Sequence, residues 1–242
     1  MQTLIITIVS LAVLVKLGSF LHRLYKNCPS IWARAINKFS KADQQEFPPQ
    51  GAALFVGSSS IRFWESLEQD MAPLPVINRG FGGSMIHQVI HYADRIVLPY
   101  RPKAIFFYAG ENDISGILFT RKHSAEQVLQ NFQTFCEKVH QQLPDVTIHF
   151  ISIKPPKTRM KYWGEMQRAN QLIETYCNSD PRLHYIDIVP AMLNDKGETR
   201  VDLLKADGIH LNESGYAIWA RVIKPLVSNV FPENNVDSLT PQ

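Results

Sequence analysis

The chain has 242 residues, of which 45% are hydrophobic and 19% charged, with a formal net charge of +3 at pH 7. This length and composition allow one domain with a sizeable core and leave residues for an appendage. The basic excess gathers near the N-terminus, so we expect no distributed basic face for nucleic acid; it comes from Arg23, Lys26, Arg34, Lys38 and Lys41. Zinc–thiolate sites and disulfide scaffolds are not expected either, because the cysteines, Cys28, Cys136 and Cys177, lack C-x-x-C spacing.

The N-terminal segment 1–21 is predicted to be a membrane anchor. Residues 3–21 read TLIITIVSLAVLVKLGSFL, which is about the length needed to cross a bilayer. No basic region precedes this run and no small-residue cleavage site follows it, so an uncleaved anchor is expected. A short signal peptide and a buried or interfacial helix are the alternatives. The basic residues that follow favour a cytoplasmic domain, but they are few, and the side of the membrane stays open.

Residues 22–50 are interpreted as a juxtamembrane helix and linker, residues 51–231 as the folded domain and residues 232–242 as a polar tail. Within the domain, strand-like apolar runs alternate with segments of helical periodicity. We expect strands at 52–56, 76–78, 104–108, 147–153 and 183–188, and helices over 86–97, 128–139, 166–176 and 216–227. A capping box at Ser124 and Gln127 precedes the second helix. This alternation predicts an α/β fold with a parallel sheet covered on both faces.

Ligands of such sheets bind beyond the carboxyl ends of the strands, where several turns of this chain should converge. In the first turn, a glycine ends the apolar run and three serines follow, Ser58, Ser59 and Ser60. A strand–turn–helix of this kind presents a serine near a helix N-terminus, where backbone N–H groups favour negative charge. A phosphate-binding loop or a plain helix cap would have a similar sequence.

An acid and a histidine stand three residues apart in the late turn Asp207-Gly208-Ile209-His210. In a turn they can meet, so that the carboxylate accepts from one imidazole nitrogen while the other nitrogen faces a hydroxyl. A serine nucleophile needs this arrangement, since its hydroxyl is unreactive without a base. The alternative is a surface turn with a solvated histidine.

Two further turns offer hydrogen-bond donors for an oxyanion. The glycines of Gly80-Phe81-Gly82-Gly83 leave backbone N–H groups open to a ligand, and Asn112 in Gly110-Glu111-Asn112-Asp113 follows a strand directly. Each turn taken alone also has a purely local explanation as a tight turn.

Taken together and in this order, the four turns resemble those of the SGNH hydrolases, also called GDSL esterases and lipases, over roughly residues 52–227. The resemblance implies a flavodoxin-like three-layer α/β/α sandwich with a five-stranded parallel sheet. It also implies a triad of Ser59, His210 and Asp207, with an oxyanion hole formed by Ser59, Gly83 and Asn112. The expected activity is hydrolysis of carboxylic esters without a cofactor or metal.

The sequence departs from the family at Ser58, which replaces the acidic residue that usually precedes the nucleophile. We expect a changed hydrogen bond there and a retained activity, with Ser58 and Ser60 as rival nucleophiles. A membrane-tethered acyltransferase and a non-catalytic module that binds carbohydrate or phosphate are the alternative functions. Short acyl esters, acetylated sugars and lysophospholipids are the candidate substrates, and the sequence does not indicate an oligomeric state.

Several other residues invite a functional interpretation. Tyr162 and Trp163 are candidates for a hydrophobic lid, and Arg62 and Arg79 for contacts with an anionic group, although packing and internal ion pairs explain them equally well. The remaining histidines show no metal-ligand spacing with acids, and His87 and His91 are interpreted as a polar helix face.

Overall fold

The fold is taken from a computed structural model, which describes residues 10, 13–21, 28–116 and 120–232. Its centre is a sheet of strands β1 (Ala53–Gly57), β2 (Val76–Gly80), β3 (Ala104–Tyr108), β4 (Thr147–Ile151) and β5 (Leu183–Ile186). All neighbouring strands are parallel, and their order is β2-β1-β3-β4-β5. The predicted five-stranded parallel sheet is confirmed. Every residue of β1 and β3 is buried, as expected for central strands covered on both faces.

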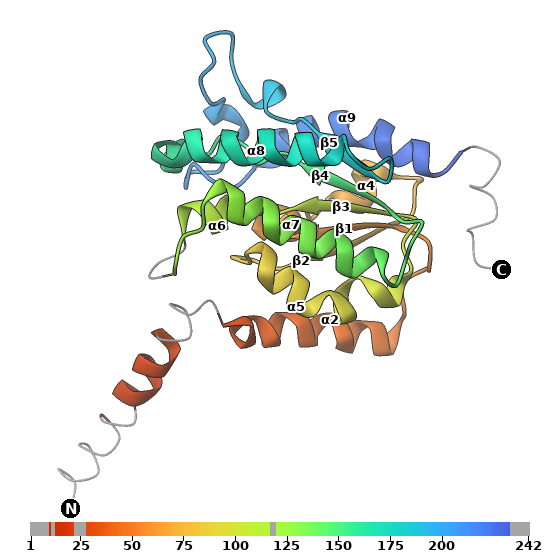
Figure 1. Cartoon of the computed structure of the whole chain (residues 1–242), viewed down its shortest axis with the longest axis horizontal. Coiled ribbons are helices and arrows are strands. Elements are labelled where there is room, and N and C mark those ends of the chain that lie inside the picture. The colour runs from red at the N-terminus through yellow and green to blue at the C-terminus, as the bar shows by residue number, and fades with distance from the viewer. Residues whose placement is uncertain (1–9, 11–12, 22–27, 117–119, 233–242) are drawn as a thin grey trace, which may run out of the picture.

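Helices cover both faces of this sheet and complete a three-layer sandwich (Figure 1). On one face, the core includes buried residues of α2 (Ala33–Gln45), α5 (Ile86–Ile96), α7 (Ala125–His140) and α8 (Trp163–Cys177). On the other face, it includes residues of α3 (Ser59–Arg62), α4 (Leu67–Met71) and α9 (Glu213–Val230). Successive strand residues alternate between the two cores, so that Leu54 packs in the first and Phe55 in the second.

The connecting segments contain the short helix α6 (Glu111–Ser115) and the 3₁₀ helices η1 (Pro29–Trp32), η2 (Leu98–Tyr100), η3 (Lys157–Tyr162), η4 (Pro190–Met192) and η5 (Val201–Leu203). Helix α7 begins with the predicted capping box. Ser124 Oγ accepts from the Gln127 N–H at 3.4 Å, and Gln127 Oε1 accepts from the Ser124 N–H at 3.0 Å.

Part of the segment interpreted as a linker packs on the domain. Trp32 and Ile36, from η1 and α2, lie in the core beside α5. The Trp32 indole donates to the Gly82 carbonyl at 2.8 Å, and the Asp43 carboxylate accepts from Arg79 at 2.6 Å. Residues 29–45 therefore extend the sandwich, although the sequence pattern alone suggested a connection to it.

About half of the predicted anchor (residues 1–9, 11 and 12) and all of the tail after residue 232 lie outside the described residues. Within the described part of the N-terminal segment, residues 13–21 are helical and carry exposed hydrophobic side chains, at Val13, Leu14, Val15, Leu17 and Phe20. Among the residues that the structure describes, none belongs to a helix with both the length and the apolar character required to span a bilayer.

Candidate active site

The carboxyl end of β1 presents Ser59 at the first position of α3. A sharp turn at Gly57, where φ is 142°, joins the strand to the helix. A Cβ at position 57 would lie 1.9 Å from the carbonyl oxygen of Tyr108 on the neighbouring strand, so only glycine fits. The Ser58 N–H donates to this same carbonyl at 2.9 Å, which ties the turn to β3. The position of Ser59 is thus fixed by the sheet.

The late turn brings its acid and its histidine to this serine. His210 Nε2 lies 2.9 Å from Ser59 Oγ, and His210 Nδ1 lies 2.6 Å from Asp207 Oδ2. The other oxygen of Asp207 accepts from the Ile209 and His210 N–H groups at 2.8 and 2.9 Å. One continuous line of hydrogen bonds therefore joins Asp207, His210 and Ser59. The histidine and the serine in this line are 151 positions apart in the sequence.

This arrangement keeps Asp207 ionised over a wide pH range. Burial by itself raises the pKa of Asp207, but hydrogen bonds from the His210 ring and from the N–H groups of His210 and Ile209 outweigh it and lower the pKa to about 2. The Phe63 ring packs edge-on against the His210 imidazole with 5.0 Å between centroids, which limits movement of the imidazole.

The three consecutive serines differ in their surroundings. Ser58 and Ser60 are 3% and 2% exposed, whereas Ser59 is partly exposed and lies at the histidine. Ser59 thus differs from its two neighbours in being both partly exposed and hydrogen-bonded to His210. Ser58 sits at the N-cap of α3, and its side chain makes no capping hydrogen bond.

Donors for an oxyanion lie on the turns that follow β2 and β3. Gly83 has φ of 76°, a conformation that glycine adopts readily, in the turn before α5. Asn112 lies in the first turn of α6, and its Nδ2 donates to the Ser84 carbonyl at 3.1 Å, which joins the two turns. Because an amide nitrogen carries two hydrogens, this bond leaves the second for a ligand.

Behind Asn112 lies a buried ionic cluster that the sequence analysis missed. Glu111 accepts from Lys154 Nζ at 2.5 Å and from Arg159 Nη1 at 2.9 Å, and Tyr108 Oη donates to it at 3.1 Å. Lys154 has no exposed surface. Burial favours a raised pKa for Glu111, but the charges of Lys154 and Arg159 outweigh it, so the pKa is lowered. Arg159 also donates to Asn112 Oδ1 at 3.1 Å and so couples the cluster to the candidate oxyanion donor.

Some residues singled out in the sequence serve the fold instead. Arg79 is bound by Asp43 and donates to the Tyr100 hydroxyl at 2.7 Å, so its charge is satisfied inside the protein. Tyr162 and Trp163 pack partly buried against the core. His87, interpreted as part of a polar helix face, lies close to Asp113 and His123.

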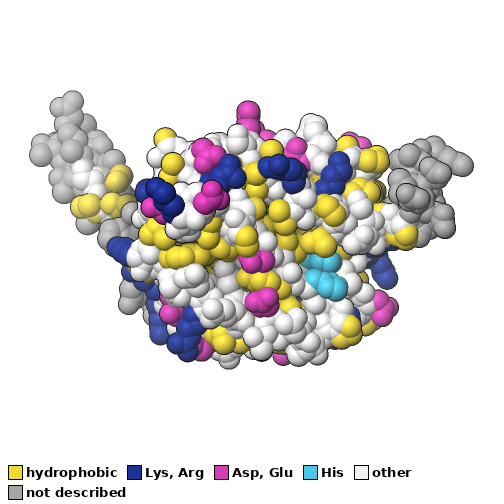
Figure 2. All heavy atoms as spheres, turned by 90° about the horizontal axis from the view of Figure 1, so that it is seen from above, with side chains coloured by type: hydrophobic (Ala, Val, Ile, Leu, Met, Phe, Trp, Pro, Cys, Tyr) yellow, Lys and Arg dark blue, Asp and Glu magenta, His cyan; other side chains and the backbone are white. Residues whose placement is uncertain are grey.

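A separate groove lies at the edge strand β5, and its lining includes Lys103, Thr147, His149 and His184. It is near the amino ends of the strands, whereas Ser59 lies beyond the carboxyl end of β1. Figure 2, which looks onto this side of the sandwich, shows histidine side chains beside hydrophobic ones and charges of both signs interspersed. His149 stacks between Phe106 and His184, and burial together with His184 lowers its pKa to about 3. Its imidazole is therefore neutral and part of the core.

The sequence profile of the GDSL-like Lipase/Acylhydrolase family matches residues 51–218. No curated protein sequence matches the chain. Among solved structures, a protein from Streptococcus pneumonia assigned as a platelet activating factor is 19% identical with a TM-score of 0.71, over 90% of this chain and 99% of that one. A GDSL-like lipase from Bacteroides thetaiotaomicron is 16% identical with a TM-score of 0.68, over 81% and 98%. A carbohydrate esterase family 3 protein from Talaromyces cellulolyticus is 14% identical with a TM-score of 0.57, over 78% and 100%. At these identities the similarity to the solved structures shows a shared fold.

Because the profile covers more than half of the chain, the protein belongs to the GDSL-like Lipase/Acylhydrolase family and is a hydrolase of ester bonds.

Proposed function

We propose that the protein is a serine esterase in which Ser59 is the nucleophile, His210 the general base and Asp207 the residue that orients the base. The observation that carries this proposal is the unbroken line of contacts from Asp207 Oδ2 through the imidazole to Ser59 Oγ, at 2.6 and 2.9 Å. Both distances are within hydrogen-bonding range, as a nucleophile–base–acid relay requires.

In the first half of the reaction, Ser59 Oγ attacks the ester carbonyl while His210 Nε2 takes the hydroxyl proton. The resulting imidazolium is stabilised by the ionised Asp207. His210 then returns the proton to the leaving alcohol, and an acyl-enzyme remains on Ser59. In the second half, water attacks this ester with His210 again as base, which releases the carboxylic acid and restores the serine.

The negative charge of the tetrahedral intermediate needs donors on the opposite side of the carbonyl. We assign this role to the backbone N–H groups of Ser59 and Gly83 and to the Asn112 amide. Their location on three turns at one edge of the sheet supports the assignment. Loss of one such donor costs about two to three orders of magnitude in kcat.

We further propose that residues 3–21 anchor the protein in a membrane and that its substrates are esters of lipids or of envelope glycans. The exposed hydrophobic side chains of residues 13–20 support the anchor. The related structures include a lipase-like protein and a carbohydrate esterase, which makes both ester classes reasonable substrates for trial. Residues 22–28 would then connect the anchor to the sandwich.

The nucleophile is tested by hydrolysis of chromogenic acetyl and long-chain acyl esters by the full chain in detergent. Ser59→Ala should reduce kcat/KM by several orders of magnitude, whereas the matched Ser58→Ala should retain activity. A fluorophosphonate reagent should label Ser59, as located by peptide mass spectrometry. Equal rates in wild type and Ser59→Ala, or a label on Ser58 or Ser60, would contradict the assignment.

The anchor is tested separately by fractionation of cells that express the full chain. We expect the protein in the membrane pellet after an alkaline carbonate wash, and a version without residues 1–21 in the supernatant. Recovery of the full chain in the supernatant without detergent would refute the anchor.

A further inference from the structure

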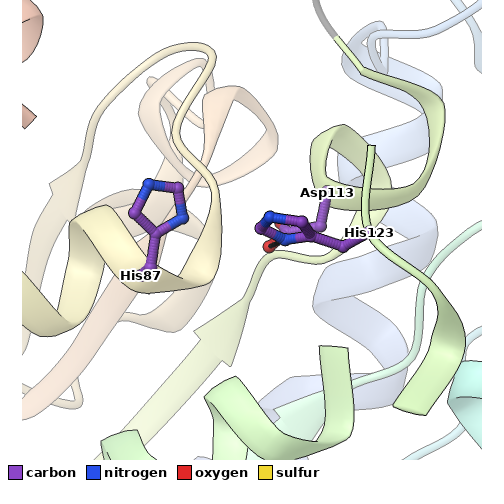
Figure 3. A group of neighbouring side chains, drawn as sticks. All are labelled: His87, Asp113 and His123. Carbon is purple, nitrogen blue, oxygen red and sulfur yellow. Dashed lines mark hydrogen bonds and ion pairs between the residues drawn. The ribbon is translucent and has the colours of Figure 1, made fainter. Parts of the chain in front are cut away.

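Three side chains from separate segments converge beside the oxyanion turns. His87 lies in the first turn of α5, Asp113 in α6 and His123 just before the start of α7. Each offers one ligand atom, and these three atoms lie within 4.8 Å of one another. Figure 3 shows the His123 imidazole pointing toward that of His87, with the Asp113 carboxylate next to the His123 ring.

Two of the three ligands are already held together. The His123 N–H donates to the backbone carbonyl of Asp113 at 2.8 Å. The Asp113 side chain has no exposed surface, and its two oxygens lie 3.2 and 3.3 Å from the Ile86 N–H at the start of α5. The carboxylate is therefore fixed in place, while both imidazoles are partly exposed and can adjust to a ligand.

The distance between His123 Nδ1 and Asp113 Oδ1 is 3.4 Å. This contact is a long hydrogen bond, since the usual N···O distance is about 2.7–3.2 Å. The same distance matches the spacing of about 3.4 Å between two ligands that bind one tetrahedral zinc ion at about 2.1 Å each. The His87 ligand atom lies within 4.8 Å of the other two. It would therefore have to approach them by at most about 1.4 Å to reach the same spacing, which a side-chain rotation at a partly exposed position can supply.

We propose that His87, Asp113 and His123 form a binding site for Zn²⁺ or a similar transition-metal divalent cation. Two imidazoles and one carboxylate, with no sulfur ligand, suit such an ion better than Mg²⁺ or Ca²⁺, which prefer oxygen ligands only. Three protein ligands leave a fourth position of the tetrahedron for water. The sequence offers no motif for this site because its members are 26 and 10 residues apart along the chain.

The metal ion would tie together the two turns that carry the candidate oxyanion donors. Gly83 and Ser84 lie in the turn before α5, which carries His87, and Asn112 directly precedes Asp113. The ion would reinforce the existing bond between Asn112 Nδ2 and the Ser84 carbonyl. This effect on catalysis rests on the proposed esterase mechanism, whereas binding of the ion does not.

Binding is tested on the metal-free full chain, prepared without a polyhistidine tag. Titration with Co²⁺ should give the intense visible absorption of a four-coordinate ion at one equivalent per chain, and Zn²⁺ should abolish it by displacement. Zn²⁺ should also raise Tm. Loss of a residue that only hydrogen-bonds a metal ligand weakens metal binding about 10–100-fold. His87→Ala and His123→Ala each remove a ligand itself, so each should weaken binding by more than that.

His91→Ala is the matched control, because His91 lies on the same helix one turn after His87 and packs edge-on against Tyr92. It should bind Co²⁺ like the wild type. His87→Cys supplies a thiolate ligand and should recover binding with a shifted cobalt spectrum, which separates ligand loss from misfolding. Ser59→Ala should bind the ion normally, so failure of the metal site and failure of the esterase proposal are distinguishable.

Two results would overturn the proposal. One is the lack of stoichiometric Co²⁺ or Zn²⁺ binding by the wild type. The other is equal affinity in wild type, His87→Ala and His123→Ala. Either result would leave Asp113 with the purely structural role of accepting from the first N–H of α5.

Discussion

Arg159 donates to the side-chain oxygen of Asn112 at 3.1 Å, and this bond determines which way the amide faces. A guanidinium has donors only, so the Asn112 oxygen must point toward it and the NH₂ group must point away, toward Ser84. Arg159 lies in η3, which follows β4, and Asn112 lies in α6, which follows β3. An arginine from one connection thereby orients a candidate oxyanion donor on another.

Replacement of Arg159 should therefore reduce turnover more than it reduces substrate binding. Arg159→Met keeps the length of the side chain but removes the donors, and we expect kcat to fall about tenfold or more with little change in KM. This loss should remain below the two to three decades expected for removal of the donor itself, as in Asn112→Ala. Steady-state kinetics on an acetyl ester measure both quantities.

Arg168→Met is the control for this change, because Arg168 is exposed on α8 and pairs with Glu126 at the surface. Its kinetics should match the wild type. A change confined to KM in Arg159→Met would indicate that Arg159 contacts the substrate and does not position Asn112.

Replacing only one member of the buried pair of Lys154 and Glu111 should strongly destabilise the folded protein. Lys154 has no exposed surface and Glu111 only 5% in their side chains, so Glu111→Gln leaves an ammonium group without its carboxylate. We expect Glu111→Gln to lower the free energy of unfolding by about 3–5 kcal/mol, measured by urea denaturation.

The double variant Glu111→Gln/Lys154→Met tests whether this cost comes from the pair. With both charges gone, it should be more stable than the sum of the two single changes predicts. Additive effects of the two substitutions would contradict a direct interaction between these side chains.

Asp207 should make the stability of the protein depend on pH in the acid range. Its pKa is lowered from 3.8 to about 2 in the folded protein, so folding favours the ionised form. The resulting stabilisation is fully present above the unfolded value and is lost as the pH falls through the folded value. The stability difference between wild type and Asp207→Asn should thus shrink as the pH falls from about 4 to about 2.

Urea denaturation of both proteins at a series of pH values measures this difference. Because the Asp207 side chain is 44% exposed, solvent screening should make the change modest. A difference that stays constant down to pH 2 would show that the hydrogen bonds to His210 do not stabilise the carboxylate.

Gly57 should not tolerate a side chain, in contrast to Gly164. An added Cβ at position 57 would lie 1.9 Å from the Tyr108 carbonyl oxygen, whereas at position 164 it would meet nothing within 4 Å. Gly57→Ala should cost more than about 4 kcal/mol, which is exceptional for one substitution. Gly164→Ala, within α8, should not destabilise the protein and should raise its free energy of unfolding by up to about 1 kcal/mol. Thermal unfolding of the two variants makes the comparison, and similar Tm values would contradict it.

The sequence alone predicted the sheet and the convergence of its turns because both depend on local patterns. Short apolar runs predict buried strands, and the rule that parallel strands share one carboxyl edge brings Ser59, Gly83 and Asn112 together. The meeting of Asp207 and His210 was predicted for the same reason, since three residues of one turn separate them. Their roles in catalysis remain predictions until the variants are measured.

Contacts between distant segments were not predictable in this way. Lys154 and Arg159 occupy a Lys/Pro-rich stretch with no motif, and only the pairing of β3 with β4 brings them to Glu111. The packing of Trp32 was missed because the segment after the apolar N-terminus has the mixed composition of a connector. His123 is brought to Asp113 by a backbone hydrogen bond just before α7, which no local periodicity reveals.

The contact between Trp32 and Gly82 bears on how this protein should be shortened for expression. A version that starts at residue 51, where the family profile begins, would lack the indole that holds the glycine turn beside Ser59. It would also leave Arg79 inside the protein without its carboxylate partner Asp43 and uncover the α5 surface that Ile36 protects. Such a fragment would fold poorly or show low activity for reasons unrelated to Ser59, Asp207 and His210. A shortened version should begin before Pro29, so that the whole of η1 and α2 is retained.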